Sequence, residues 1–171
     1  MKLRIPYLMA ALVATASFFY LADSRGLSAA PVVSLTTMEG HTINLAEPDG
    51  TTRLVTFWAP DCAISERNIP SLSQLEKQFA NEAFEIVAVA MPYSEEKEIG
   101  EYVAKNKVGY PVAFDRTGTT SDAFPGVRFT PTTFLIDGNS NIVWKHIGKL
   151  RTAEFATHIK QTLHSQQLAA R

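Results

Sequence analysis

A single cysteine, Cys62, stands between a run of β-forming residues and a stretch with helical periodicity, in the sequence LVTFWAPDCAISERNIPSL. Dithiol redox chemistry needs a second thiol close by, because the second thiol resolves the mixed disulfide that the first one forms. Here the residue three positions further along is Ser65. A serine hydroxyl cannot form a disulfide, although it can donate a hydrogen bond to a thiolate. The pattern therefore predicts chemistry by one thiol, with Cys62 and Ser65 as the catalytic candidates.

The reactivity of Cys62 depends on how easily its thiol ionises. The start of a helix favours a thiolate, because unpaired N–H groups and the helix dipole stabilise an anion there. Asp61 acts in the opposite direction, since a neighbouring carboxylate raises the pKa of a thiol. Two interpretations stay open at this point. Cys62 is either a nucleophile assisted by Ser65 or an inert small residue in a degenerate site.

The elements around Cys62 indicate an α/β domain with one mixed central sheet flanked by helices. Residues 53–59 and 84–93 are apolar runs typical of strands buried on both sides. Helices are expected over residues 64–79 and 94–107, the second with Ser94 as its N-cap. The other expected elements are an N-terminal β-hairpin at 32–45, a short strand at 110–115, a second hairpin at 132–148, and a final helix carrying Phe155, Ile159 and Leu163.

The first 23 residues have the pattern of a membrane-targeting segment. Lys2 and Arg4 precede an uncharged, mostly apolar run over residues 5–22. As a helix this run spans about 27 Å, close to the roughly 30 Å of a hydrocarbon core. A buried core helix fits poorly, because the run has no polar face. The positive end stays in the cytoplasm. We therefore expect the rest of the chain on the extracytoplasmic, periplasmic side of a bacterial inner membrane.

Signal-peptide cleavage requires small residues at positions −3 and −1. Cleavage after Ala22 would place Tyr20 at −3, and cleavage after Ala30 lies well past the apolar run. Neither site is good, so we expect residues 1–23 to stay as an anchor. Release into the periplasm after cleavage is the alternative. In the resulting division, residues 24–30 form a linker and residues 31–171 form the domain.

Charge and composition restrict the other function classes. The 171-residue chain carries 16 basic and 17 acidic side chains with no basic run, which argues against a nucleic-acid partner. Its four histidines show no metal-ligand spacing with one another or with Cys62, and no cofactor motif is present. We expect a monomer without metal or cofactor. The histidines are His41, His146, His158 and His164.

Two separated motifs resemble the membrane-anchored, extracytoplasmic TlpA/ResA-like thioredoxins. The pattern F-W-A-T-x-C-x-x-C-x-x-E-x-P of that family is matched at Phe57, Trp58, Ala59, Cys62 and Pro70. The later pattern G-V-x-x-T-P-T-T-F-L-I-D is matched at ten positions within residues 126–137, in the correct order. The resemblance covers residues 31–163 and also the anchor. It implies a thioredoxin-like fold and thiol–disulfide exchange, with protein or small-molecule thiols and disulfides as partners.

The departures from the family pattern change the expected mechanism. Ser65 replaces the second cysteine, and Asn68 replaces a glutamate to which the resemblance assigns proton transfer with that cysteine. The resemblance therefore implies half of the family reaction. Cys62 forms a mixed disulfide, and an external thiol resolves it. The competing hypothesis is a non-catalytic, membrane-tethered binding module.

The family also implies a cis peptide bond at Thr130-Pro131, placed against the cysteine. Thr130, Pro131 and Trp58 are accordingly the predicted substrate-binding residues, while an ordinary proline at a strand start is the alternative for Pro131. A thiol peroxidase is a weaker hypothesis. Its pattern P-x-x-x-T-x-x-C would require proline and threonine where Val55 and Ala59 stand.

Overall fold

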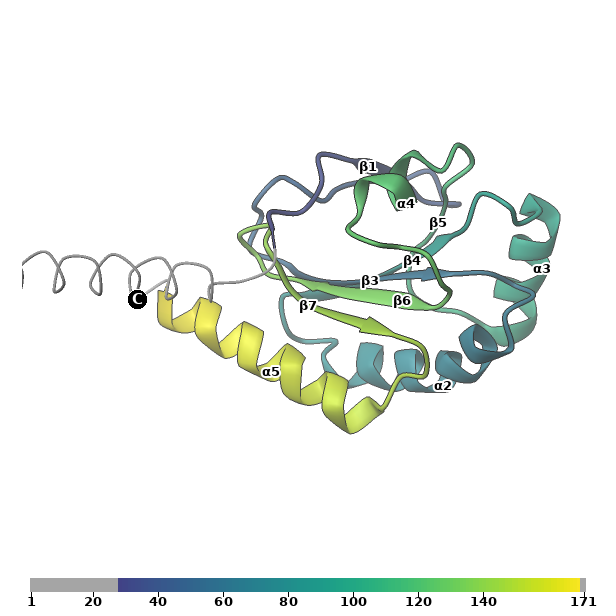
Figure 1. Ribbon diagram of the computed structural model, residues 1–171. Helices are drawn as coiled ribbons and strands as arrows, with labels where there is room; N and C mark the ends of the chain where they lie inside the picture. Colours follow the sequence, from purple (N-terminus) through teal and green to yellow (C-terminus); the bar gives the residue numbers. More distant parts are fainter. Residues whose placement is uncertain (1–27, 170–171) are drawn as a thin grey trace, which may run out of the picture.

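A five-stranded mixed sheet forms the centre of the computed structural model, which describes residues 28–169 (Figure 1). The strand order is β5-β4-β3-β6-β7. The strands β3, β4 and β5 are parallel, and β6 and β7 add antiparallel pairs at the other side of β3. This is the mixed sheet that the sequence predicts. The strands are β3 Thr52–Trp58, β4 Phe84–Ala90, β5 Val112–Phe114, β6 Thr132–Ile136 and β7 Ile142–Ile147.

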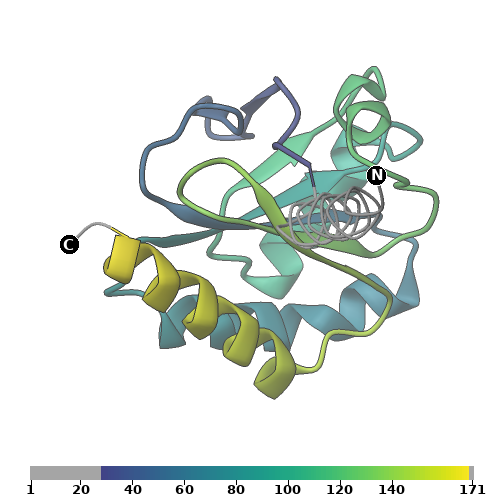
Figure 2. The same cartoon turned by 60° about the vertical axis from the view of Figure 1, so that its left-hand side comes forward.

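Three long helices pack on one face of the sheet: α2 Ala63–Gln78, α3 Glu96–Asn106 and α5 Thr152–Ala169 (Figures 1 and 2). Their apolar residues form one core with the sheet, in which Leu75, Ile99 and Phe155 are fully buried. Every residue of β3 is buried, which agrees with its mostly apolar sequence. The segment that carries Cys62 therefore starts from a fully buried strand.

The opposite face of the sheet is covered by the N-terminal hairpin and a short helix. The hairpin consists of β1 Ser34–Thr36 and β2 Thr42–Asn44, joined through a turn in which Gly40 has a φ of 87°. The helix α4, Thr119–Ala123, was not predicted from the sequence, because five residues are too few to show helical periodicity. Leu35, Phe124 and Phe134 belong to the core on this side.

The last residues of the predicted linker pack against the domain. Ala30 is only 5% exposed, and its N–H donates to the carbonyl of Ser140 at 2.7 Å. Ala29 forms a β-bridge with Asn141. The predicted anchor at residues 1–23 lies outside the described residues. Between residues 28 and 169, no helix combines the length and apolar character needed to cross a membrane.

The helix α3 begins one residue later than its predicted cap. Glu95 occupies the N-cap position, and its side chain makes no capping hydrogen bond. Ser94 instead belongs to a turn after β4, where its N–H donates to the carbonyl of Met91 at 3.0 Å. The prediction of Ser94 as the cap is therefore wrong, because a turn that follows the strand uses this residue first.

Candidate functional site

Cys62 lies at the N-cap of α2, with backbone angles φ −89° and ψ 106°. A tight turn leads from β3 into this position, since the Cys62 N–H donates to the carbonyl of Ala59 at 3.1 Å. The carbonyl of Cys62 then accepts the first helical hydrogen bond, from the N–H of Glu66 at 3.1 Å. The side chain is partly exposed. The strand, loop and helix start therefore present the sulfur at the surface, as the sequence predicts.

The surroundings of the sulfur favour the thiolate. Partial burial raises the pKa of the Cys62 thiol, but hydrogen bonds outweigh this effect and leave the pKa below its ordinary value. These bonds come first from the side chain and backbone of Ser65, and then from the Thr130 side chain and the Ile64 backbone. The Asp61 carboxylate, which the sequence places in opposition, is exposed to solvent. The direction of the pKa shift, left open by the sequence, is downward.

Ser65 lies one helical turn below Cys62 and is 95% buried, with a relative exposure of 5%. While the Cys62 thiol is neutral, the Ser65 hydroxyl has no hydrogen-bond partner among the described residues, so its bond to the sulfur belongs to the thiolate form. In the neutral thiol, the Cys62 S–H points instead to the carbonyl of Thr130, with a sulfur–oxygen distance of 3.4 Å. The Ser65 hydroxyl is therefore available to donate when the sulfur becomes an anion.

Thr130 and Pro131 reach the same place from the start of β6. Their peptide bond is cis. Thr130 is half-buried and contributes the carbonyl that accepts from Cys62, while Pro131 is buried, with its carbonyl held by the N–H of Gly148 at 2.8 Å. The structure thus brings Cys62, Ser65, Thr130 and Pro131 together in one site.

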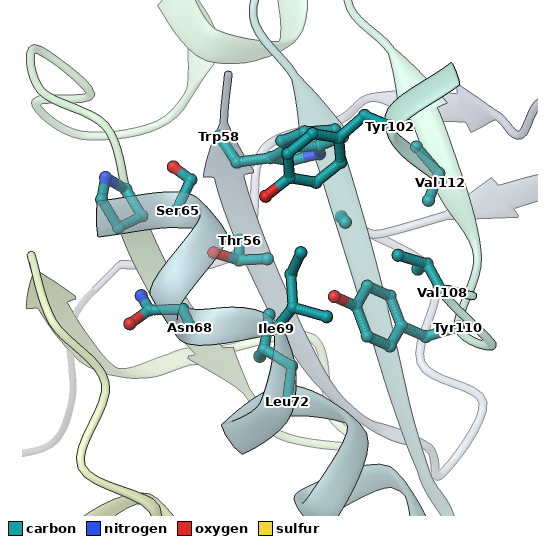
Figure 3. A pocket seen from close by; sticks show the side chains of 12 residues that line it. Thr56, Trp58, Ser65, Asn68, Ile69, Leu72, Tyr102, Val108, Tyr110 and Val112 are labelled. Carbon is teal, nitrogen blue, oxygen red and sulfur yellow. The ribbon is translucent and has the colours of Figure 1, made fainter. Parts of the chain in front are cut away.

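Trp58 does not belong to the outer surface of this site. It is 6% exposed and packs against Tyr102 of α3, with ring centroids 4.7 Å apart. Its ring lines a cavity between the helices and the sheet (Figure 3). The side chain lies on the face of β3 that the helices cover. Contact between Trp58 and a substrate stays a prediction.

Asn68 has a structural role in the connection between β7 and α5. Its amide donates to the carbonyl of Gly148 at 3.2 Å, and its side-chain oxygen accepts from the N–H of Leu150 at 2.9 Å. The residue is 3% exposed. A glutamate in ionised form could not make the first of these bonds, because a carboxylate has no donor. Sequence reasoning missed this role, since the partners lie about eighty residues further along the chain.

Three large exposed apolar side chains belong to the segments next to Cys62 and Thr130. Ile64 is 41% exposed, Tyr93 is 61% exposed and Phe129 is 66% exposed. Tyr93 places its hydroxyl 3.5 Å from the Thr130 hydroxyl. Ile64 and Phe129 are close to Cys62 and Thr130 in the sequence, whereas nothing in the sequence connects Tyr93 with them. We call Ile64, Tyr93 and Phe129 the apolar rim.

Side chains that could bind a metal ion do not cluster in the part of the chain that the structure describes. Within residues 28–169, no three histidine, cysteine, aspartate or glutamate side chains gather in a way that could hold a metal ion. His146 and His158 instead stack or pack around Trp144, with the His158 ring centroid 4.1 Å from that of the indole.

Comparison with known proteins agrees with this geometry. The model of the AhpC/TSA family matches residues 27–145. The chain belongs to the AhpC/TSA family. It is 31% identical over 111 residues to the thiol-disulfide oxidoreductase ResA of Halalkalibacterium halodurans, which covers 65% of this chain and 62% of that protein. It is also 31% identical to a thiol-disulfide oxidoreductase ResA of Bacillus cereus, over 70% of this chain and 68% of that protein.

Solved structures place the chain among thioredoxin-fold proteins. A thiol:disulfide interchange protein of the thioredoxin family from Chlorobium tepidum TLS has a TM-score of 0.71 and 27% identity, and the match covers 80% of this chain and 96% of that one. The resemblance to ResA-like thioredoxins and the predicted thioredoxin-like fold are confirmed. At this site the chain itself carries one cysteine, Cys62, with Ser65 and Asn68 three and six positions further along.

Proposed function

We propose that this protein is a thiol–disulfide exchange protein that acts through Cys62 alone. The observation that carries the proposal is the position of the sulfur, which is partly exposed at a helix start and lies among hydrogen-bond donors that lower its pKa. An inert relic would have no need of an accessible, ionisable thiol. Ser65 stabilises the thiolate, and the Thr130 carbonyl holds the proton of the neutral form.

The reaction proceeds in two exchange steps. The Cys62 thiolate attacks one sulfur of a substrate disulfide, which breaks the S–S bond, forms a Cys62–substrate mixed disulfide and releases the other sulfur as a thiolate. An external thiolate then attacks the substrate sulfur of the mixed disulfide. This releases Cys62 as a thiolate and leaves the substrate joined to the external thiol. No net oxidation or reduction occurs, so no other reductant is needed.

The apolar rim supports a protein substrate. Three large apolar side chains that remain exposed around one sulfur form a surface suited to the apolar residues flanking a target cysteine. A peroxide substrate is less well supported, because Ala59 lies three residues before Cys62 and its methyl group cannot donate a hydrogen bond. A binding module that uses this surface without chemistry is the competing outcome of the test below.

The test is formation and resolution of a mixed disulfide. Reduced protein is incubated with a peptide disulfide, and mass spectrometry follows the Cys62–peptide adduct before and after addition of glutathione. We expect a 1:1 adduct that glutathione removes, and no adduct in Cys62→Ser. Ser65→Ala should form the adduct more slowly. An absent adduct, or one that glutathione does not resolve, would refute the exchange mechanism and favour the binding module.

We further propose that the domain works outside the cytoplasm, as a monomer held by an anchor at residues 1–23. The support is the cationic start followed by the uncharged apolar run. The division into anchor, linker at 24–30 and domain at 31–171 belongs to the same proposal. Mass spectrometry of protein extracted from membranes decides it. A mature N-terminus near residue 23 or 31 would show that the segment is removed.

A further inference from the structure

A small cavity lies between α2, α3 and the inner face of the sheet, next to the start of α2 (Figure 3). The space available to the centre of a water-sized sphere is about 20 Å³. A buried water needs roughly 10–15 Å³ of such space and two to four polar partners. The cavity is therefore large enough for one water and too small for a substrate.

Three of the residues that line this cavity each carry a buried polar atom with no hydrogen-bond partner. These atoms are the indole N–H of Trp58, the hydroxyl of Ser65 and the hydroxyl of Tyr102. Only one other buried side-chain atom within residues 28–169, the Ser94 hydroxyl, shares this condition. Buried polar groups are nearly always paired with protein or ordered water. Three unpaired atoms around a water-sized space point to the same missing partner.

We propose that one ordered water occupies this cavity and joins Trp58 and Tyr102 to Ser65, so that the Ser65 hydroxyl is directed at the Cys62 sulfur. The chemistry of the three groups sets the direction of the hydrogen bonds. The indole N–H can only donate, so the water accepts from Trp58. The water then donates to the Ser65 oxygen, and the Ser65 O–H is left to donate to the thiolate.

This arrangement makes Trp58 and Tyr102 positioning residues for the thiolate. Hydrogen bonds that follow one another in the same direction polarise and strengthen each other. The titratable groups near the sulfur are Asp61 and Glu66 at the start of α2, Tyr93 beside Thr130, and Tyr102 across the cavity. The Trp58→Phe variant changes none of them, so its effect on ionisation isolates the water chain.

The first test detects the water directly. In a nuclear magnetic resonance experiment on the reduced protein, we expect a cross-peak between water and the Trp58 indole proton, of the kind that long-lived buried water gives. Tyr102→Phe should weaken this cross-peak while the ring packing on Trp58 remains. A cavity that is dry in this experiment and in a high-resolution crystal structure would overturn the proposal.

The second test measures the ionisation of Cys62 from the pH dependence of its alkylation by iodoacetamide. We expect Ser65→Ala to reduce the ionisation constant about tenfold, and Tyr102→Phe or Trp58→Phe to reduce it about twofold. In the Ser65→Ala background, Tyr102→Phe should have no further effect. Ser94→Ala, which removes an unpaired buried hydroxyl outside the cavity, is the control and should leave ionisation unchanged.

The role of this water in catalysis rests on the proposed exchange mechanism, but the two proposals can fail independently in these experiments. If Tyr102→Phe and Ser65→Ala act additively, the water chain is wrong even where mixed disulfides form normally. If the chain is present and Cys62 forms no mixed disulfide with a peptide, the water site stands and the proposed function fails.

Discussion

Exchange of Asn68 for aspartate tests whether the β7–α5 connection depends on an amide. Asn68→Asp keeps the size and shape of the side chain. The oxygen that accepts from the N–H of Leu150 at 2.9 Å remains, but the group that donates to the carbonyl of Gly148 at 3.2 Å becomes an acceptor. At neutral pH, a carboxylate would then face a carbonyl oxygen in a place where the side chain is only 3% exposed.

The expected cost follows from these contacts. A lost hydrogen bond costs about 1 kcal/mol, and a charged carboxylate that faces the part-buried Gly148 carbonyl adds about 1–3 kcal/mol. We therefore expect Asn68→Asp to lower the free energy of unfolding by about 2–4 kcal/mol at neutral pH. Burial and the facing carbonyl both disfavour the charged form, so the pKa of the new carboxyl rises on folding. A protonated carboxyl donates again.

The pH dependence of this loss is specific. When a folded-state pKa is raised, stability is fully present below the unfolded-state value, about 3.9 for aspartate, and is lost as pH rises through the folded-state value. Urea unfolding followed by tryptophan fluorescence should show a small penalty at about pH 4 and the full penalty at neutral pH. Asn139→Asp, at an exposed position, is the control and should change stability by less than about 0.5 kcal/mol. A penalty in Asn68→Asp that is absent, or equal at both pH values, would refute the assignment.

Three further predictions concern other contacts. Hydrogen bonding by Arg53 lowers the pKa of Asp49. The resulting stabilisation of the folded state is present above about pH 4 and is lost as pH falls through the folded-state pKa. Arg53→Met should remove this part of the acid dependence of the free energy of unfolding, measured by urea unfolding. Cys62→Ala should change the free energy of unfolding by less than about 1 kcal/mol, because its sulfur makes one weak hydrogen bond at 3.4 Å; a larger change would show a structural role. Phe129→Ala should slow adduct formation with an apolar peptide disulfide while thermal stability stays unchanged, since the ring is 66% exposed; equal rates would remove Phe129 from the apolar rim.

Local and periodic features of the fold were predictable from the sequence. The buried strands β3 and β4 follow from mostly apolar runs, and the hairpin of β6 and β7 follows from two β-forming segments around a Gly-Asn-Ser turn. The place of Cys62 at a helix start and the presence of Ser65 beneath it were also predictable. Both depend on residues within one helical turn of each other.

Features that depend on contacts distant in the sequence were not predictable in this way. The inward orientation of Trp58 becomes visible only with Tyr102 packed against it. Tyr93 reaches the site because the turn after β4 lies next to Thr130, which no spacing in the sequence indicates. The sign of the pKa shift at Cys62 similarly required Thr130 and Ser65 to be placed around the sulfur.

The two departures from the family pattern have different physical consequences. Ser65 lies beside Cys62 at the start of α2, and its hydroxyl contributes to the lowered pKa of that thiol, so its exchange for cysteine would replace a hydrogen-bond donor with a second thiol. Asn68 uses both its donor and its acceptor to hold the segment that leads into α5. A glutamate there is longer and, when ionised, lacks the donor. Reversing Ser65 alone therefore changes the chemistry of the site, whereas reversing Asn68 also disturbs the backbone that supports it. In the proposed mechanism, Ser65 therefore determines that one thiol acts alone, whereas Asn68 supports the backbone beside that thiol.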